Sequence, residues 1–274
     1  RRSRTLFAAV TTVAFSILSL GFGIEERGGR DAKDNELTAV YGMELSGGDT
    51  AGVCTAFLVT PNLLFTAAHC VYNYSITSLS NAPDINRATR RYSNPKFHKP
   101  VILPKYKELR KNREARDPIL MQHDFAYIKL KNPVTGITPL PIKGVHELPD
   151  NGSFSYIGKN VRTVGYGVTR YRGKDADYSE EHRGIKRYGS SKIEGISSWM
   201  FTLPGLSGNI LPGDSGGPLM ILENGQWSVI GVNQSIAHKT ETEYDEGRIV
   251  GLRRELVCWA ERDSGVQIPG AICP

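Results

Sequence analysis

Gly213-Asp214-Ser215-Gly216-Gly217-Pro218 is the most informative segment of the sequence, and it runs directly into the apolar residues 219–222. Glycine adopts backbone conformations that other residues avoid, so such a turn can point the N–H groups of Gly213 and Ser215 toward one position. Two converging N–H groups stabilise an oxygen that develops negative charge. The segment therefore predicts a nucleophile, Ser215, beside an oxyanion hole formed by the backbone of Gly213 and Ser215. The alternative is a glycine turn whose serine has no chemical role.

A histidine stands at the end of an apolar hairpin in the first third of the chain. Residues 53–59 and 63–65 are expected to be buried strands, joined by a turn at Pro61-Asn62. The second strand leads into Thr66-Ala67-Ala68-His69-Cys70. A general base needs a rigid mounting, because it must stay within hydrogen-bond reach of the nucleophile. The pattern makes His69 a candidate base, although alone it also fits a structural histidine.

An aspartate opens the next clear strand. Residues 123–130, His-Asp-Phe-Ala-Tyr-Ile-Lys-Leu, alternate so that Ala126, Ile128 and Leu130 share one face. A carboxylate that enters a core strand is costly unless it is hydrogen-bonded, and an imidazole N–H is one suitable donor. Asp124 is therefore a candidate partner for a histidine, and the alternative is an aspartate that caps a turn.

The composition fits a folded, all-β chain. Of the 274 residues, 39% are hydrophobic and 23% charged, enough apolar material for one large domain or two small ones. The 29 glycines and 15 prolines are scattered between short apolar runs, with no internal repeat and no long helical stripe. These features exclude a mainly disordered or collagen-like chain and favour β-structure over a helical bundle.

The N-terminal residues form a separate segment. Three arginines among the first four residues precede the uncharged residues 5–24, which are rich in Leu, Val, Phe and Ala and contain small residues near their end. This pattern predicts a signal peptide over 1–23 and a single domain over 24–274, secreted or periplasmic. The alternative is a retained membrane anchor, since about 20 apolar residues can span a bilayer. After removal of the signal we expect no membrane contact.

The four cysteines fall into two close pairs. A secreted chain would oxidise them, which predicts the disulfides Cys54–Cys70 and Cys258–Cys273. Each closes a loop of about 15 residues and is expected to contribute about 3 kcal/mol. A zinc site is the alternative, but Cys-x-x-Cys and His-Glu-x-x-His spacings are both missing from the sequence. We therefore expect no metal.

Positive charge is concentrated in one segment. The formal net charge is +6, and residues 87–116 alone hold eleven Lys or Arg against two Glu, a net +9. Such a run suits nucleic acid, an anionic surface or an acidic partner. A solvated loop is the other interpretation, because Tyr92, Phe97 and Tyr106 are spaced too irregularly for a stacking platform. We expect no nucleic-acid partner.

The order of the candidate residues is His, Asp, Ser, and the three segments together resemble the chymotrypsin-like (trypsin-fold) serine endopeptidases. The matching motifs are Thr66-Ala67-Ala68-His69-Cys70, Asp124 in its strand, and the segment from Gly213 to Pro218. Val164-Gly165-Tyr166-Gly167 is similar to a glycine-aromatic-glycine strand of that family, and residues 256–262 resemble its closing helix. The resemblance covers residues 36–262.

The resemblance implies two packed six-stranded antiparallel β-barrels with a C-terminal helix and an active site between the barrels. His69 and Asp124 would come from the first barrel and Ser215 from the second. It also implies a Cys54–Cys70 disulfide, whereas Cys258–Cys273 rests on proximity in sequence. The implied activity is peptide-bond hydrolysis through an acyl-enzyme.

The roles implied by the resemblance are Ser215 as nucleophile, His69 as base and then acid, and Asp124 as the group that holds the imidazole. The implied substrates are polypeptides, and no cofactor is needed. We expect a monomer. The alternative function is a protease-fold binding or adhesion protein that acts through the basic 87–116 loop.

The chain departs from the family pattern where a processed N-terminus is expected. The usual Ile-Val-Gly-Gly string is missing, and the nearest string is Glu26-Arg27-Gly28-Gly29. In the family the carboxylate at the Asp214 position pairs with the amine of that N-terminus. Our hypothesis is that signal removal after Gly23 exposes Ile24, whose amine pairs with Asp214. Trimming after Arg27 or Arg30, or another cation at Asp214, is the alternative.

The substrate pocket also departs from the pattern of trypsins. Leu211 stands where a cysteine is usual, and Asn209 occupies the pocket floor in place of an aspartate. Counting back from Trp259 places Gly247 on the opposite wall. The nearby acids Glu241, Glu243, Asp245 and Glu246 can supply the missing charge or form a solvated loop. The sequence therefore leaves the preferred cleavage site open.

Overall fold

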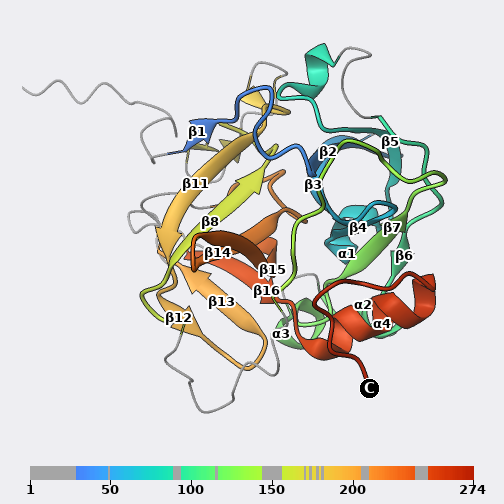
Figure 1. The fold of residues 1–274 in the computed structure, drawn as a ribbon, viewed down its shortest axis with the longest axis vertical. Coiled ribbons are helices and arrows are strands. Elements are labelled where there is room, and N and C mark those ends of the chain that lie inside the picture. The colour runs from blue at the N-terminus through green and yellow to red at the C-terminus, as the bar shows by residue number, and fades with distance from the viewer. Residues whose placement is uncertain are drawn as a thin grey trace, which may run out of the picture.

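Two curled antiparallel sheets lie side by side in the computed structural model (Figure 1). The structure describes residues 29–48, 50–88, 94–114, 117–143, 156–169, 171–172, 175–176, 179, 182–204, 210–237 and 246–274. The all-β prediction of two antiparallel barrels with a C-terminal helix is confirmed. The predicted signal segment, residues 1–23, lies outside the described residues.

The first sheet has six strands in the order β5-β2-β3-β4-β7-β6. Their bounds are β2 Val40–Gly47, β3 Thr50–Thr60, β4 Leu63–Thr66, β5 Ser75–Ser80, β6 Val101–Ile102 and β7 Ala126–Lys129. The predicted turn at Pro61-Asn62 joins β3 to β4, and every residue of β4 is buried. Phe65 stacks edge-on against Phe57 and Phe125, with ring centroids 6.0 and 4.8 Å apart. This aromatic core fixes the strands that precede His69 and follow Asp124.

The second sheet has eight strands in the described part of the chain, in the order β1-β11-β8-β14-β15-β16-β13-β12. The two-residue strands β1 and β12 extend its edges, so the sheet is wider than the six strands expected. The strands are β1 Arg30–Asp31, β8 Asn160–Gly165, β11 Arg187–Lys192, β12 Gly195–Ile196, β13 Met200–Leu203, β14 Pro218–Glu223, β15 Gln226–Ala237 and β16 Glu246–Gly251. A separate pair contains β9 Tyr171–Arg172 and β10 Asp175–Ala176.

Strand β15 has two irregular features, a tight turn before it and a bulge within it. Asn224 and Gly225, both with positive φ, form the tight turn between β14 and β15, as an Asn-Gly pair between strands indicates. Farther along, the register of β15 against β16 shifts between Asn233 and Ser235. Gln234 is therefore the extra residue of a β-bulge, a device that re-aims a side chain.

The helices are short except at the C-terminus. They are α1 Ala68–Val71, the 3₁₀ turn η2 Ile85–Arg87, α2 Pro104–Arg110, α3 Pro118–Met121 and α4 Arg254–Ser264. The predicted closing helix is α4, which lies against the first sheet (Figure 1). Trp259 of α4 packs on Phe125 and Tyr127, with ring centroids 6.0 and 5.4 Å apart. Gly265, with φ +67, ends the helix in the left-handed conformation.

The described part of the basic 87–116 segment includes regular secondary structure, whereas one interpretation of the sequence was a solvated loop. It contains β6 and α2, and Tyr106 of α2 is buried against Tyr72, with ring centroids 5.9 Å apart. Tyr106 thus serves the core rather than a stacking surface, while Tyr92 lies outside the described residues. Within the described ranges no helix is both long enough and apolar enough to cross a membrane.

Candidate active site

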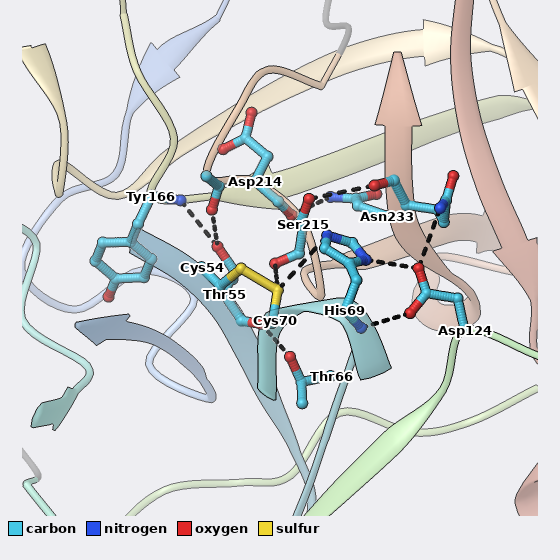
Figure 2. Close-up of a disulfide and its surroundings, with 12 residues drawn as sticks. Cys54, Thr55, Thr66, His69, Cys70, Asp124, Tyr166, Asp214, Ser215 and Asn233 are labelled. Carbon is cyan, nitrogen blue, oxygen red and sulfur yellow. Dashed lines mark hydrogen bonds and ion pairs between the residues drawn. A yellow bond between two sulfur atoms is a disulfide. The ribbon is translucent and has the colours of Figure 1, made fainter. Parts of the chain in front are cut away.

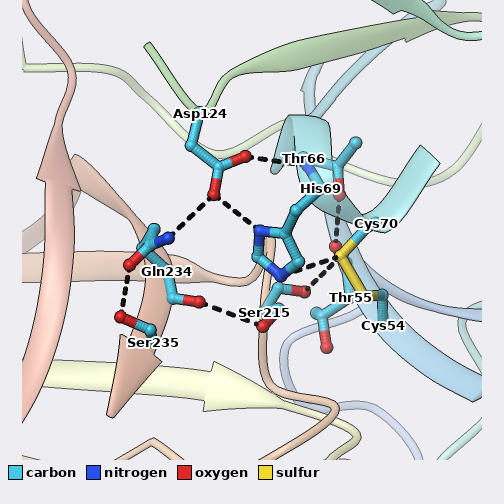
Figure 3. A network of polar contacts seen from close by, with 9 residues as sticks. All are labelled: Cys54, Thr55, Thr66, His69, Cys70, Asp124, Ser215, Gln234 and Ser235. Carbon is cyan, nitrogen blue, oxygen red and sulfur yellow. Dashed lines mark hydrogen bonds and ion pairs between the residues drawn. A yellow bond between two sulfur atoms is a disulfide. The ribbon is translucent and has the colours of Figure 1, made fainter. Parts of the chain in front are cut away.

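His69 and Asp124 meet where two neighbouring strands of the first sheet end. β4 leads into α1, which carries His69, and Asp124 precedes β7, which pairs with β4. Nδ1 of His69 lies 2.6 Å from Oδ2 of Asp124, and the backbone N–H of His69 donates to Oδ1 at 2.8 Å (Figure 3). Because an ionised carboxylate only accepts, Nδ1 carries the proton and Nε2 is left as a free base.

A third donor completes the surroundings of Asp124. Its side chain is 1% exposed, and Nε2 of Gln234 donates to Oδ2 at 3.1 Å. Burial opposes the charge on both partners. The charge of His69 and the hydrogen bonds from His69 and Gln234 outweigh it and lower the pKa of Asp124. In the same way the charge and hydrogen bond of Asp124 outweigh burial and raise the pKa of His69 above its ordinary value. The pair is arranged to accept a proton at His69.

Ser215 is held by backbone geometry and by a strand of the other sheet. Gly213 and Gly216 have φ of +97 and +84, so both use the left-handed region that the glycine turn was expected to need. Thr55 of β3 donates its N–H to the carbonyl of Ser215 at 2.8 Å and its hydroxyl to the carbonyl of Gly213 at 3.1 Å (Figure 2). Strand β3 thereby fixes the turn from the first sheet.

The three predicted residues lie together, with the His69 imidazole between the Asp124 carboxylate and Ser215 (Figure 3). The Ser215 hydroxyl donates to the carbonyl of Gln234 at 3.2 Å. Among the described residues no hydrogen bond joins it to Nε2 of His69, a geometry common in free enzymes. The N–H groups of Gly213 and Ser215 donate to no described residue.

Asp214 points away from His69, on the other side of the Ser215 turn (Figure 2). Its carboxylate accepts the N–H groups of Gly167 and Leu211, each at 2.8 Å. Burial dominates over these bonds and over the more distant Arg187, and it raises the pKa of Asp214 to about 6. A Cβ on Gly165 would lie 2.0 Å from the carboxylate, so the glycine is needed for this close approach.

Both predicted disulfides are present, Cys54–Cys70 and Cys258–Cys273. Cys54 lies on β3 and Cys70 follows His69 in α1, so the bond ties the histidine to the strand that holds the Ser215 turn. Sγ of Cys70 is 3.9 Å from Nε2 of His69. The two sulfurs and this imidazole are the described group closest to a metal-ligand set, but the sulfurs are bonded to each other and offer no thiolate.

Comparison with known proteins assigns the family. The Trypsin family model matches residues 26–249. The chain belongs to the trypsin family. The resemblance drawn from the motifs around His69, Asp124 and Ser215 is thereby confirmed.

Individual trypsin-family relatives are distant. Chymase of Mus musculus is 30% identical over 176 residues, which cover 61% of this chain and 64% of the relative. Mast cell protease 2 of Meriones unguiculatus is 29% identical over 181 residues, with the same coverage. Spermosin of Halocynthia roretzi is 28% identical over 236 residues, 75% of this chain and 54% of the relative. The chain spans less than two thirds of the length of these relatives.

Of three further residues predicted for this trypsin-family site, the structure describes one. Asn209 and Ile24 lie outside the described residues. Gly247 lies in β16, where it pairs with Leu203 of β13 and Ile236 of β15. Its partner Ile236 lies two residues after the bulge residue Gln234 in β15.

Two residues of the site were missed by sequence reasoning. Thr55 lay inside a predicted strand, next to Cys54, and nothing in an alternating pattern marks a hydroxyl that reaches another sheet. Gln234 follows the apolar residues 229–232 and Asn233, and its inward direction depends on a bulge that is set by pairing with β16. An amide and a hydroxyl side by side in an apolar strand, Gln234-Ser235, were the only available signal.

Proposed function

We propose that this chain is a secreted serine endopeptidase that hydrolyses peptide bonds through an acyl-enzyme, with His69, Asp124 and Ser215 as its triad. The observation that carries the proposal is the 2.6 Å contact between Nδ1 of His69 and Asp124, which leaves Nε2 as the basic nitrogen on the side of Ser215. The trypsin-family membership and the protease names of the relatives support it. The substrates are polypeptides.

In the acylation step, Oγ of Ser215 attacks the carbonyl carbon of the scissile peptide and its proton passes to Nε2 of His69. Rotation of the hydroxyl from the Gln234 carbonyl to Nε2 precedes this transfer. Asp124 stabilises the imidazolium and keeps the proton on Nδ1. His69 then protonates the leaving amine, and the C–N bond breaks. Water repeats the sequence on the ester, which restores Ser215.

The oxyanion of each tetrahedral intermediate binds to the N–H groups of Gly213 and Ser215. Support comes from their having no acceptor among the described residues and from the positive φ of Gly213, which only glycine adopts without strain. Loss of one such donor costs about 3 kcal/mol of transition-state stabilisation. The reaction requires no cofactor, and we expect the enzyme to act as a monomer.

Activation is proposed to involve Asp214. A buried carboxylate whose pKa is raised to about 6 and whose described partners are backbone N–H groups is suited to a cation. Under this proposal residues 1–23 are a signal peptide, Ile24 is the mature N-terminus, and its amine pairs with Asp214. Support comes from β1, whose Arg30 pairs with Tyr188 of β11, and from Arg187 of β11, whose charge acts on Asp214. N-terminal sequencing of active enzyme tests the site, and a start upstream of Ile24 or well beyond Arg30 would contradict it.

The pocket residues are proposed to be Asn209 and Gly247, with Asn209 at the floor. Because Asn209 is uncharged, we do not assign cleavage after Arg or Lys. Profiling of cleavage sites in a peptide library, followed by the same profile for Asn209→Asp, tests the assignment. A gain of preference for basic residues in the variant is expected, and an unchanged profile would remove Asn209 from the pocket.

Reaction with a fluorophosphonate probe tests the proposed function as a whole. The processed protein should be labelled stoichiometrically at Ser215, and Ser215→Ala should not be labelled. Ser228→Ala, near the start of β15, is the matched control and should react like the wild type. A folded, processed protein that takes up no label would instead support the alternative, a protease-fold binding protein acting through the basic 87–116 segment.

A further inference from the structure

Helix α2 leaves the first sheet at the level of Asp124. Before it, β6 pairs with β7 as far as Ile102, which lies opposite Ala126. The N–H of the next residue, Leu103, donates to the carbonyl of Phe125 at 3.1 Å. Phe125 directly follows Asp124 in the chain, so α2 begins beside the aspartate of the site.

The same helix packs on α1, which carries His69. Tyr106 of α2 is 2% exposed and stacks on Tyr72, at the C-terminal end of α1, with ring centroids 5.9 Å apart. The guanidinium of Arg110, one turn later, lies 6.0 Å from the centroid of the Tyr72 ring. Burial raises the pKa of Tyr106, and the charge of Asp124 adds to the rise, so this phenol stays neutral. Helix α2 is therefore fixed against the elements that carry His69 and Asp124.

The surface formed by α2 and its flanks is strongly positive. Residues 94–114 contain seven Lys or Arg and two Glu. Two of the seven cations have carboxylate partners, because Lys105 lies 3.1 Å from Glu108 and Arg113 lies 2.6 Å from Asp117. The other five form no ion pair with any described residue, and we call them the basic surface: Lys96, Lys99, Lys107, Arg110 and Lys111. The positive charge of the basic surface is therefore left to interact with solvent or with a partner.

Two of these cations form an exposed stripe at the end of α2. Lys107 and Lys111 are both exposed and stand four residues apart, so they share one face of the helix. Tyr106 and Arg110 occupy the neighbouring face, which packs on Tyr72. Cations near the end of a helix interact favourably with its dipole, but two cations at this spacing also repel each other. An acidic partner would relieve that repulsion.

We propose that the basic surface binds acidic segments of polypeptide substrates beside the bond that Ser215 attacks. The inference rests on the proposed function and deepens it by naming a class of substrates. An extended chain advances about 3.3 Å per residue, so a few residues lead from Ser215 past His69 and Asp124 to the start of α2. Carboxylates there would lie within the range of about 8 Å over which surface charges interact at physiological salt.

A polypeptide fits the basic surface better than a nucleic acid or a membrane does. Proteins that bind single strands without sequence preference use aromatic side chains on which the bases stack. The aromatic residues of 94–114 are Phe97 and Tyr106, and both pack into the hydrophobic core. Membrane contact would need exposed large apolar side chains, and residues 94–114 have none. Positive charge beside a peptidase site is instead suited to attracting acidic substrates.

The first test uses two chromogenic peptides that share one scissile bond and differ in a short flanking run, Glu in one peptide and Gln in the other. At low ionic strength, about 0.01 M, the ratio of kcat/KM for the acidic peptide to that for the neutral peptide should be about 10. At about 1 M salt the ratio should fall to about 1 to 2, because salt screens exposed charges. A ratio near 1 at both salt concentrations would overturn the proposal.

The side of the scissile bond provides an internal control. The acidic run is placed before the bond in one peptide and after it in another. Because α2 adjoins only the Asp124 edge of the site, the preference should appear on one side of the bond. Equal preference on both sides would indicate general attraction to a positively charged protein and would contradict a local surface.

The second test removes the exposed stripe. Lys107→Gln/Lys111→Gln should lower the ratio at low salt by about 3-fold or more, and Lys107→Glu/Lys111→Glu should bring it below that of a neutral surface. The matched control is Lys159→Gln/Lys192→Gln, which removes the same charge from the second sheet. These two lysines lie at the end of β8 and β11 away from Asp214. The control should keep the wild-type ratio, and an equal loss in both variants would overturn the proposal.

Active-site titration with the fluorophosphonate probe separates this inference from the proposed function. A processed wild type that takes up no label and hydrolyses neither peptide contradicts the proposed function. A wild type that is labelled but has no preference for the acidic peptide contradicts only the role of the basic surface. The salt dependence is measured on the wild type, so it decides the matter even if a variant fails to fold.

Two binding measurements cover the other partners. They are sedimentation with vesicles of equal parts phosphatidylserine and phosphatidylcholine, and retention of single-stranded DNA. We expect Lys107→Gln/Lys111→Gln to change the peptide ratio more than either of these. Binding to vesicles or DNA that is lost in this variant, together with a peptide ratio near 1 in the wild type, would overturn the proposal in favour of a lipid or nucleic-acid partner.

Discussion

The two sheets hold their parts of the site in different ways. The first sheet presents His69 and Asp124 through side-chain hydrogen bonds inside a buried polar cluster. The second presents Ser215 through the backbone, in a turn whose glycines have positive φ. The first half is therefore sensitive to the loss of a charge or a donor, and the second to any added side-chain atom. This contrast predicts which substitutions lower activity alone and which also unfold the chain.

The largest loss of activity should come from substitutions of His69, Asp124 and Ser215. Here the two halves of the site should respond equally. Ser215→Ala, His69→Ala and Asp124→Asn each should reduce peptide hydrolysis by about 10⁴-fold or more, because the three residues act as one unit. Each variant should keep the wild-type melting temperature within a few degrees. Kinetics with a chromogenic peptide provide the measurement, and the His69→Ala/Ser215→Ala double variant should lose little more. Substantial hydrolysis by Ser215→Ala would refute the mechanism.

The next largest effect is expected in the glycine turn that holds Ser215. A Cβ on Gly216 would lie 2.2 Å from both the carbonyl of Thr55 and the hydroxyl of Thr66, at a φ of +84. Gly216→Ala should therefore cost more than about 4 kcal/mol of unfolding free energy and abolish fluorophosphonate labelling.

Gly225 offers a matched control for that substitution. It has a similar φ of +77, but nothing lies within 4 Å of its Cβ position. Gly225→Ala should cost only about 1 to 2 kcal/mol, the strain of the left-handed conformation, and leave activity intact. Chemical denaturation of both variants supplies the comparison, and equal losses would show that crowding at Gly216 is unimportant.

Removal of either disulfide should have an effect of intermediate size, and the two disulfides differ in their distance from the site. Their sequence separations are 16 and 15 residues, so removing either by paired Cys→Ala substitution should cost about 3 kcal/mol on the chain-entropy account. Only Cys54–Cys70 adjoins His69, so only its loss should also lower kcat at temperatures where the chain stays folded. Equal kcat values for the two paired variants would show that the Cys54–Cys70 disulfide does not help to position His69.

The smallest effect concerns Asp214. Its folded pKa of about 6 lies above its ordinary value of 3.8, so the folded state binds more protons between these values and stability should fall as pH rises from about 4 to about 6. In a chain with its N-terminal extension intact, Asp214→Asn should remove this slope, a change of about 2 kcal/mol. In processed enzyme, pairing with the new amine should lower the pKa and abolish the slope already in wild type. Urea titrations at several pH values measure it, and a slope in both forms would contradict the pairing.

The sequence was most informative where chemistry and local geometry coincide. His69, Asp124, Ser215 and the glycines around the nucleophile stand in short strings whose spacing already indicates their role, and the strands that carry them were predicted within a few residues. Thr55 and Gln234 could not be predicted, because their roles depend on contacts between sheets and on a register shift. Neither contact leaves a periodic trace in one sequence. The ordered helix in the basic segment was missed because the buried Tyr106 is its only clear apolar anchor.

The hydroxyl and N–H of Thr55 have a consequence for how such a chain can be divided or recombined. The strand that carries Thr55 belongs to one sheet, yet it completes the turn of the other. Consider a hybrid that joins residues 29–143 of this chain to the second half of a relative. The two hydrogen bonds of Thr55 would form only if the turn around the relative's serine has carbonyls in the positions of those of Gly213 and Ser215. Conversely, a first half with Val at this position would keep the backbone N–H contact to Ser215 but lose the hydroxyl contact to the carbonyl of Gly213. The residue at position 55 therefore helps to decide whether the two halves of such a chimera fit together, in addition to the shape of the surfaces at which they meet.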